Sequence, residues 1–582
     1  MKSKSRFFQW VIIAVGIYLA AFLLISLNAP KQFQAPLFDN LGNYEWEITT
    51  YSKDANRFFT QGMIMAYGFN HGEAERSFRE AIRLDSTCAM AYWGLAYVLG
   101  PNYNMDMEEA NKEEVLWAIN KADSLKEGLR AWERMLIEAL QAKYSKSKEK
   151  GNTSEDYRAA MQKVYERFPD HPEIITLYAE SIMNLHAWDL YEKDSEEPKP
   201  WTPEIVGLLY EALKVAPEHP LANHLMIHAT EASDNPGQAI RSAKLLASLV
   251  PGSGHLVHMP SHVYIRTGDY HLGSLANEEA VKVDSAYITK CNVEGVYPQL
   301  YYPHNYHFLA ATAALEGRGS RAIEAAFSMS DIIDRNYLGK PGFATTQHYI
   351  TIPYNTLVKF AQWEKILLLD EPDTTYKYPL AMWHYARGMA YVNKGFLNIA
   401  ETELGRLKKF KKHPRVRELM IWDINSGSSI LQIAENVLAA EIAMKQNDFH
   451  NARQYLEAAI EIEDQLNYNE PPDWFFSVRH ILGELMIDRG NYEYARKLYQ
   501  EDLENFPKNG FALNGLYHAL IGLRELEQAE SIKQKFDEAW KYADVTLKYS
   551  RIDPGKRKNL PLKLGFNTPD ELLFLAGSAC GR

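Results

Sequence analysis

A short sequence element recurs along the chain between stretches of helical periodicity. It has the form small-x-aromatic-x-x-Ala, and several copies continue into an alanine- and aromatic-rich segment that ends near a proline or an acidic turn. Past residue 50 the apolar residues recur at i, i+3, i+4 and i+7, without a sustained alternation long enough for a sheet. The sequence therefore predicts an all-α chain of repeated helix pairs. The copies are FNHGEA (69–74), GDYHLGSLA (268–276), KGFLNIA (394–400), NDFHNA (447–452) and GNYEYA (490–495).

These elements resemble the tetratricopeptide repeat (TPR), a helix-turn-helix unit with the pattern W-x2-L-G-x2-Y…A-x3-F…P. Residues 490–507 match the pattern well and residues 57–85 nearly as well, while the other units are degenerate and interrupted by insertions. One helix pair cannot bury its own apolar face, so neighbouring pairs stack. The resemblance implies an α-solenoid of TPR-like repeats that winds as a right-handed superhelix. Four glycines are expected where paired helices approach closely: Gly62, Gly94, Gly388 and Gly483.

The N-terminal segment predicts a membrane anchor. Residues 10–27 (WVIIAVGIYLAAFLLISL) are uncharged and just long enough to span a bilayer. Lys2, Lys4 and Arg6 precede them, so the positive-inside rule places the N-terminus in the cytoplasm. The stretch is longer than the apolar region of a signal peptide, so we expect an uncleaved signal-anchor, with a cleaved signal peptide as the alternative. The sequence thus predicts a single-pass protein of the inner membrane with its body in the periplasm or another extracytoplasmic space.

The expected organisation follows from these segments and from an insertion rich in acidic and turn-forming residues at 370–379. We place the seam between two superhelices at this insertion. The parts are a basic cytoplasmic segment (1–9), a transmembrane signal-anchor (10–27), a linker (28–49), an N-terminal TPR-like superhelix (50–370), a C-terminal TPR-like superhelix (371–545) and a C-terminal cap or tail (546–582).

Composition excludes several classes of protein. Three cysteines in 582 residues exclude a disulfide-stapled fold and a cysteine-rich zinc or iron–sulfur module. The absence of CxxCH excludes covalently bound c-type haem, and HExxH, GxSxG, Walker A and GxGxxG motifs are missing as well. The net charge is −12, although residues 1–32 carry four basic and no acidic side chains. Such an acidic body repels phosphate backbones, so no nucleic-acid partner is expected.

Histidine is concentrated in one part of the chain. Ten of the eighteen histidines lie between His219 and His348. In the TPR family, positions 2, 5 and 9 of the first helix of a pair point into the concave groove where ligands bind. With the inter-helix turns as anchors, eight of these twelve positions in four consecutive units are histidine. We name this set the groove histidines: His224, His228, His255, His258, His262, His304, His307 and His348.

The spacing of the groove histidines predicts a metal site. Imidazoles at i, i+3 or i+4 and i+7 share one helix face, so His255, His258 and His262 can converge, as can His224 and His228. Imidazoles from neighbouring helices can share one ion, and such a site suits Zn, Cu(II) or non-haem Fe. Two or more ions, or a non-covalent bis-His haem, are left open. The expected supporting side chains are Glu231, Tyr301, Tyr302, Tyr306 and Arg266.

Two functions are compatible with this pattern. The signature GHLVHMPSHVYIRTGDY (254–270) with YYPHNYHFLA (301–310) resembles that of exported, membrane-anchored bacterial TPR proteins, which implies fold and location but no reaction. The first function is a membrane-anchored binding or scaffold protein whose groove holds a protein or peptide partner and a transition metal. The second is a metal-dependent hydrolase or oxidase with Glu231 as the candidate general base. Without a metal, the same imidazoles would line a peptide channel. The C-terminal units (447–535) lack clustered histidines and are expected to be a plain scaffold or a protein-docking half.

Overall fold

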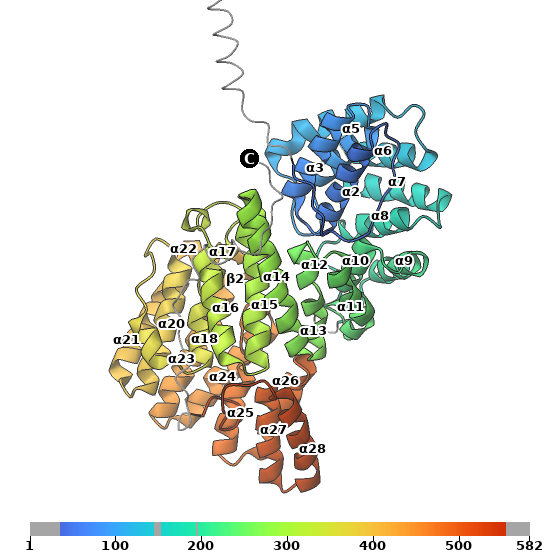
Figure 1. The fold of residues 1–582 in the computed structure, drawn as a ribbon. Coiled ribbons are helices and arrows are strands. Elements are labelled where there is room, and N and C mark those ends of the chain that lie inside the picture. The colour runs from blue at the N-terminus through green and yellow to red at the C-terminus, as the bar shows by residue number, and fades with distance from the viewer. Residues whose placement is uncertain (1–34, 145–152, 194–195, 554–582) are drawn as a thin grey trace, which may run out of the picture. The chain divides into compact units, whose positions relative to one another are not determined.

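The computed structural model describes residues 35–144, 153–193 and 196–553. From Phe38 onward the chain forms one compact unit, and its described part is almost entirely helical (Figure 1). Within these residues, no helix combines the length and the apolar character needed to cross a bilayer. The predicted cytoplasmic segment (1–9) and signal-anchor (10–27) lie outside the described residues.

Consecutive helices pack as pairs, and the first helices of neighbouring pairs also contact each other, as a solenoid requires. The first half of the array is drawn in blue and green in Figure 1. Its pairs are α2 (Lys53–Tyr67) with α3 (His71–Leu84), α4 (Ala89–Val98) with α5 (Lys112–Ser124), α6 (Ala131–Tyr144) with α7 (Thr153–Arg167), α8 (Pro172–Met183) with α9 (Thr202–Val215), and α10 (Pro220–Thr230) with α11 (Ile240–Leu249).

The array continues with a pair whose first helix is divided in two, α12 (Gly254–His258) and α13 (Pro260–Thr267), packed on α14 (Tyr270–Cys291). One short antiparallel hairpin, β1 (Met420–Ile421) with β2 (Asn425–Ser426), interrupts the helices. The remaining helices are α15 (Tyr302–Leu315), α16 (Gly319–Ile332), α17 (Thr345–Tyr349), α18 (Ile352–Lys359), α19 (Trp363–Leu368), α20 (Lys377–Asn393), α21 (Leu397–Lys411), α22 (Pro414–Arg417), α23 (Gly427–Lys445), α24 (Phe449–Asp464), α25 (Arg479–Asp488), α26 (Tyr492–Asn505), α27 (Gly510–Leu523) and α28 (Leu526–Ala539).

The close helix contacts expected at four glycines are confirmed. A Cβ atom at Gly62 or Gly94 would lie 2.7 or 2.4 Å from the Phe78 ring. At Gly388 it would lie 2.5 Å from Leu438, and at Gly483 it would lie 2.4 Å from the Tyr499 ring. These distances are far below van der Waals contact, so a larger residue at any of the four positions would force the helices apart.

The predicted linker ends earlier than expected. Leu41, Trp46 and Ile48 are buried, and the Trp46 indole stacks on Trp132 with ring centroids 5.7 Å apart. The backbone N–H of Thr49 donates to a Glu133 carboxylate oxygen at 2.6 Å. The second half of the predicted linker (28–49) is therefore part of the folded body, because its aromatic and aliphatic side chains cover the first helix pairs.

The last repeats contact the middle of the array. The Tyr270 hydroxyl donates to the carbonyl of Pro507 at 2.8 Å, and Lys508 pairs with Asp269 at 2.9 Å. The Asp544 carboxylate accepts hydrogen bonds from the backbone N–H groups of Gly319 and Ser320, the first residues of α16. These contacts attach the C-terminal helices to the first residues of α14 and α16.

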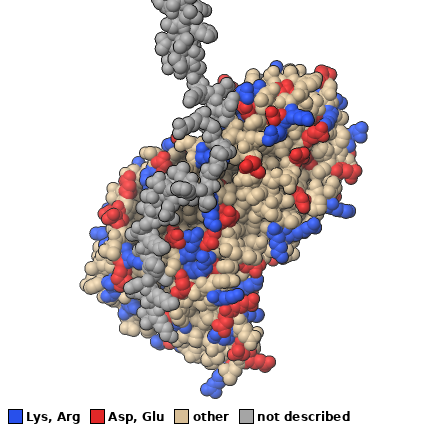
Figure 2. All heavy atoms as spheres, in the orientation of Figure 1, with Lys and Arg blue, Asp and Glu red and all other residues tan. Residues whose placement is uncertain are grey.

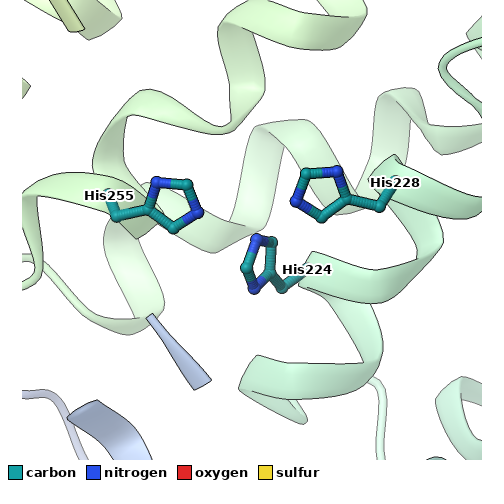
Figure 3. A group of neighbouring side chains, drawn as sticks. All are labelled: His224, His228 and His255. Atoms are coloured by element: carbon teal, nitrogen blue, oxygen red, sulfur yellow. The ribbon is translucent and has the colours of Figure 1, made fainter. Parts of the chain in front are cut away.

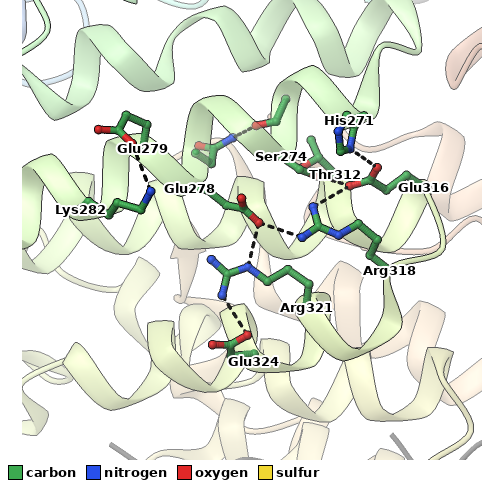
Figure 4. A network of polar contacts seen from close by, with 12 residues as sticks. His271, Ser274, Glu278, Glu279, Lys282, Thr312, Glu316, Arg318, Arg321 and Glu324 are labelled. Carbon is green, nitrogen blue, oxygen red and sulfur yellow. Dashed lines mark hydrogen bonds and ion pairs between the residues drawn. The ribbon is translucent and has the colours of Figure 1, made fainter. Parts of the chain in front are cut away.

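A polar network braces α14, α15 and α16 against each other (Figure 4). Glu278 accepts hydrogen bonds from Arg318 at 2.9 Å and from Arg321 at 3.0 Å. Glu316 accepts from the Ser274 hydroxyl at 2.6 Å and contacts the His271 imidazole at 2.9 Å. The network holds α14 and α15 together, and both helices contribute side chains to the histidine site described next.

Candidate metal centre

All eight groove histidines are buried and lie on the first helices of four consecutive pairs. His224 and His228 lie on α10, and His255 and His258 lie on α12. The others are His262 on α13, His304 and His307 on α15, and His348 on α17. The repeat register inferred from the sequence therefore places these imidazoles on successive helices that pack side by side.

Pro260 separates the helix segments that carry His258 and His262, because α12 ends at His258 and Pro260 is the first residue of α13. Proline is favoured at this position because its missing N–H is not needed in the first turn. Met259 keeps helical dihedral angles between the two helices, so His258 and His262 retain their i, i+4 relation.

Three of the groove histidines form a first triad, shown in Figure 3 with their rings turned toward a common point. His224, His228 and His255 each offer a ring nitrogen, and these atoms lie within 4.8 Å of one another. His224 Nδ1 contacts the carbonyl oxygen of Tyr67 at 2.6 Å, so that nitrogen carries the hydrogen and Nε2 presents a lone pair. The buried Nε2 atoms of His224 and His228, and both ring nitrogens of His255, lack a hydrogen-bond partner.

His258, His262 and His304 form a second triad with the same 4.8 Å limit. His258 Nδ1 lies 2.6 Å from the Asn277 side-chain oxygen. The amide of Asn277 has a fixed orientation, because its nitrogen donates to the carbonyl of Gly273 at 2.8 Å. His258 must therefore donate from Nδ1, which leaves its Nε2 as an acceptor.

The two Nε2 atoms of His258 and His262 lie only 3.0 Å apart. His262 Nδ1 faces a Glu231 carboxylate oxygen at 2.5 Å, so His262 also donates from Nδ1 and presents a lone pair at Nε2. Two lone pairs facing each other at this distance repel. Either a proton held between them or a cation bound to both removes the conflict.

Glu231 connects the two triads. One carboxylate oxygen lies 2.8 Å from His228 Nδ1, and the other contacts His262 Nδ1. Burial alone would raise the pKa of Glu231, but the adjacent imidazoles of His262 and His228 lower it below its usual range. The ionised carboxylate orients one imidazole from each triad, which is the role that carboxylates play behind metal-bound histidines.

Burial lowers the pKa of most groove histidines. The pKa values of His224, His255, His258 and His304 fall well below the ordinary value of histidine, first because of desolvation and then because of the neighbouring histidines. The pKa of His262 is also lowered by burial, although Glu231 opposes the shift. These five imidazoles are therefore neutral at neutral pH, the form that binds metal ions.

The last two groove histidines lie outside both triads. The rings of His307 and His348 are 5.8 Å apart, and the Nε2 atom of each is buried without a hydrogen-bond partner. His348 Nδ1 contacts the Tyr378 hydroxyl at 2.9 Å, and its Nε2 lies 4.0 Å from an Asp473 carboxylate oxygen. His307 stacks on Phe475. This pair extends the line of imidazoles but does not join the triads.

The predicted supporting residues divide into two groups. Tyr301 packs edge-on against the His255 ring at 5.3 Å, and Arg266 donates to the carbonyl of Ser233 at 3.1 Å at the edge of the site. Tyr302 and Tyr306 contact each other instead, with ring centroids 5.4 Å apart. On α15, Tyr302 and Tyr306 each lie two positions from His304. Residues two positions apart do not share a helix face, so both tyrosines lie on a different face from His304.

The loop between α24 and α25 supplies side chains that the sequence did not predict for the site. A Glu470 carboxylate oxygen lies 3.5 Å from His262 Nδ1 and has no hydrogen-bond partner, and Glu470 groups with Glu231 and His262 as a third set of potential ligands. Asp473 from the same loop faces His348. The C-terminal half, expected to be a plain scaffold or a protein-docking half, therefore also contributes side chains to the site.

A cleft of about 1010 Å³ leads to the site. His228 and Glu231 lie in its wall, together with Trp188, Arg266 and Glu470. The centre is thus buried in the protein but lies beside a space large enough for a small molecule.

Positive and negative side chains are mixed on the face shown in Figure 2, where the described lysine and arginine side chains are interspersed with aspartate and glutamate. A face of this kind offers little to a phosphate backbone, which favours continuous positive charge.

Comparisons with known proteins agree with the repeat pattern. A model of the tetratricopeptide repeat matches residues 436–465, which span the second half of α23 and all of α24. No curated protein matches the chain. Among solved structures, the human IFIT1 dimer with m7Gppp-AAAA aligns with 84% of this chain and 91% of its own at 14% identity and a TM-score of 0.30.

The APC/C hetero-tetramer Cut9–Hcn1 aligns with 92% of this chain and 80% of its own at 10% identity and a TM-score of 0.28. Similarity at these levels carries no argument about function. The chain contains a tetratricopeptide repeat at residues 436–465, and its recurring sequence element and stacked helix pairs are similar to such repeats.

Proposed function

We propose that this chain is a membrane-anchored, extracytoplasmic TPR binding protein that holds a transition metal in its histidine groove. The observation that carries the proposal is the 3.0 Å approach of the Nε2 atoms of His258 and His262, whose Nδ1 atoms are both committed to acceptors. Burial lowers the pKa of both imidazoles, which disfavours a proton between them. A bound cation satisfies both lone pairs at once.

The unpartnered nitrogens also argue against a channel that merely accommodates a peptide. The free ring nitrogens of His224, His228 and His255 are turned toward each other in Figure 3. Buried polar atoms without partners are destabilising, by about 1–3 kcal/mol each. A ligand shared by these nitrogens explains why several of them converge on one point. Neutral imidazoles with carboxylates nearby suit Zn, Cu(II) or Fe.

The test is elemental analysis of the full-length protein, purified without a polyhistidine tag and reconstituted with Zn, Cu or Fe. We expect near-stoichiometric metal in the native protein and its loss in a His258→Gln/His262→Gln variant. His384→Gln is the matched control, because His384 is equally buried but pairs with Glu403 far along the chain from both triads. The proposal would be refuted if the reconstituted native protein held no metal. It would also be refuted if the His258→Gln/His262→Gln variant held as much metal as the His384→Gln control.

A metal-dependent enzyme is the second candidate, and the cleft at His228 and Glu231 favours it. An ion with three imidazole ligands keeps a coordination position for water or substrate. The side chains of Arg266 and Glu470 lie in the same cleft and could contact a substrate there. Glu231 already accepts from two imidazoles, so it serves the ligands better than it would serve as a general base.

Assays of p-nitrophenyl acetate, p-nitrophenyl phosphate and catechol turnover separate the two candidates. Turnover that requires metal and disappears in the His258→Gln/His262→Gln variant would support an enzyme. Metal bound with high affinity but without turnover of any of these substrates would favour a binding role.

The proposed location and partner have their own tests. Anchoring rests on residues 10–27, and an alkaline phosphatase fused to the C-terminus is expected to be active if the body is extracytoplasmic. A protein or peptide partner is expected because TPR arrays present long surfaces for binding. Cross-linking in intact cells, compared between the native protein and the metal-free variant, would show whether the partner depends on the metal.

A further inference from the structure

A second cavity, with a volume of about 540 Å³, lies in the C-terminal half. It is bounded by α18, α20, α23 and α25 together with the loop before α25. Its wall is largely aromatic. The aromatic residues in it are Trp363, Tyr385, Phe449, Trp474, Phe475 and Phe476. A cavity of this size fits a small organic molecule.

A lysine at the end of α18 reaches into this cavity and is held by a histidine and an aspartate. Lys359 Nζ lies 3.0 Å from His480 Nδ1, and His480 Nε2 lies 2.9 Å from an Asp502 carboxylate oxygen. The Asn509 side-chain amide donates to that same oxygen at 2.5 Å. His480 therefore carries its hydrogen on Nε2, where it donates to Asp502, and presents the Nδ1 lone pair to the amine of Lys359.

The surroundings of Lys359 disfavour its charged form. Nζ lies 3.7 Å from the centroid of the Phe511 ring and 4.9 Å from that of Phe476. Burial lowers the pKa of Lys359 to about 7, with Arg551 acting in the same direction and Asp502 and Glu463 opposing it. A substantial fraction of the amine is then neutral at neutral pH, whereas an ordinary lysine is almost fully protonated.

Other polar atoms in the cavity wall lack partners. Asn355 lies one turn before Lys359 on α18, and both its amide oxygen and its amide nitrogen are buried without a hydrogen bond. The indole N–H of Trp474 is also buried and unpartnered. These atoms and the amine line the same space, so a ligand with a polar group on an apolar body would satisfy them.

We propose that Lys359 is a nucleophile and that the cavity binds a small aldehyde or ketone with an aromatic or aliphatic body. The neutral amine adds to the carbonyl carbon, and one N–H proton passes through His480 Nδ1 to the alkoxide oxygen, which gives the carbinolamine. The second N–H proton follows through His480 to the hydroxyl group, which leaves as water while the C=N bond forms. One C=N bond replaces one C=O bond, with no net change in protons or electrons. Asp502 positions His480 and does not touch the ligand.

The test is reductive trapping of the full-length protein at pH 7 with benzaldehyde and cyanoborohydride, followed by peptide mass spectrometry. Lys548, which lines the same cavity but pairs with Asp488, is the matched internal control. We expect Lys359 to be labelled at least tenfold faster than Lys548, with a rate that saturates as benzaldehyde is increased. We also expect this advantage to be lost in His480→Gln and reduced in Asp502→Asn, with circular dichroism confirming that each variant is folded.

Equal labelling of Lys359 and Lys548 would overturn the proposal, as would a rate that rises linearly with benzaldehyde, because neither result fits a binding cavity with an activated amine. The Lys359→Met variant is expected to keep its metal content. The two sites share no ligand atoms, so this proposal and the proposed metal binding succeed or fail separately.

Discussion

The buried histidines of the two halves of the molecule differ in how completely their ring nitrogens are hydrogen-bonded. In the C-terminal half, His384 contacts Glu403 at 2.5 Å, and His480 uses both ring nitrogens, one toward Lys359 and one toward Asp502. In the histidine groove, ring nitrogens are left without partners in equally buried surroundings, as at His224 and His255. Burial alone therefore does not distinguish a structural imidazole from a potential ligand.

The difference lies in whether the second ring nitrogen of each imidazole has a hydrogen-bond partner. A paired imidazole contributes to folding, and its removal leaves a buried partner without a hydrogen bond. An imidazole with a buried, unpartnered nitrogen destabilises the folded state unless a ligand binds to that nitrogen. This distinction predicts opposite effects of the same substitution in the two halves.

The largest effect is expected from replacing one histidine of each kind by leucine. His384→Leu should lower the free energy of unfolding by about 2–4 kcal/mol, because it leaves the buried Glu403 carboxylate without its imidazole. His255→Leu should raise the stability of the metal-free protein by about 1–2 kcal/mol, because it removes two unpartnered nitrogens. Urea denaturation of chelator-treated protein measures both. A similar decrease in the free energy of unfolding of the two variants would contradict this prediction.

Glu231→Gln should weaken metal binding by about 10–100-fold, as is usual when a carboxylate behind a metal ligand is replaced. Glutamine keeps one acceptor oxygen, so it can serve either His228 or His262 but not both. Competitive titration with a chromophoric chelator measures the change. Glu403→Gln, at a buried carboxylate that contacts His384 outside the triads, is the control and should leave the affinity unchanged.

The stability of the metal-free protein should fall as the pH falls from 7 to 5. Burial lowers the pKa of His348 to about 3, below its value of about 6.5 in the unfolded chain. The unfolded form therefore takes up a proton in this range while the folded form does not, which amounts to about 2 kcal/mol from this residue. His348→Gln should remove this contribution to the pH dependence of the free energy of unfolding. Unfolding curves with identical pH dependence in the two proteins would contradict it.

The sequence predicted the parts of the site that follow helical periodicity. The triads combine residues at i, i+4 on one helix with residues from the next first helix, so His224 with His228, and His258 with His262, could be paired in advance. The glycine contacts were predictable for a related reason, because each repeat needs a small residue at the same place in its helix pair.

The remaining parts could not be predicted because they have no periodic signal. Glu470 reaches His262 from a loop more than 200 residues further along the chain, and Asn277 orients His258 from the second helix of its pair. The contact between Lys359 and His480 joins residues 121 positions apart. Contacts of this kind depend on how the solenoid brings distant repeats together, and one sequence does not show that.

The smallest effect on metal affinity is expected at Tyr306. This residue is close to the groove histidines in the sequence but does not contact an imidazole. Tyr306→Phe should change metal affinity less than about twofold, because its hydroxyl contacts that of Tyr302, 3.5 Å away, and not an imidazole. Tyr301→Phe is the informative partner variant, since the Tyr301 ring packs against His255 and its hydroxyl accepts a hydrogen bond from Asn104 at 3.2 Å. Loss of one such hydrogen bond is worth about 1 kcal/mol, or about fivefold in affinity if it steadies the ring beside the first triad. Chelator competition on both variants resolves this difference, and a larger loss at Tyr306 than at Tyr301 would show that the metal lies nearer the outer face of α15 than the triads place it.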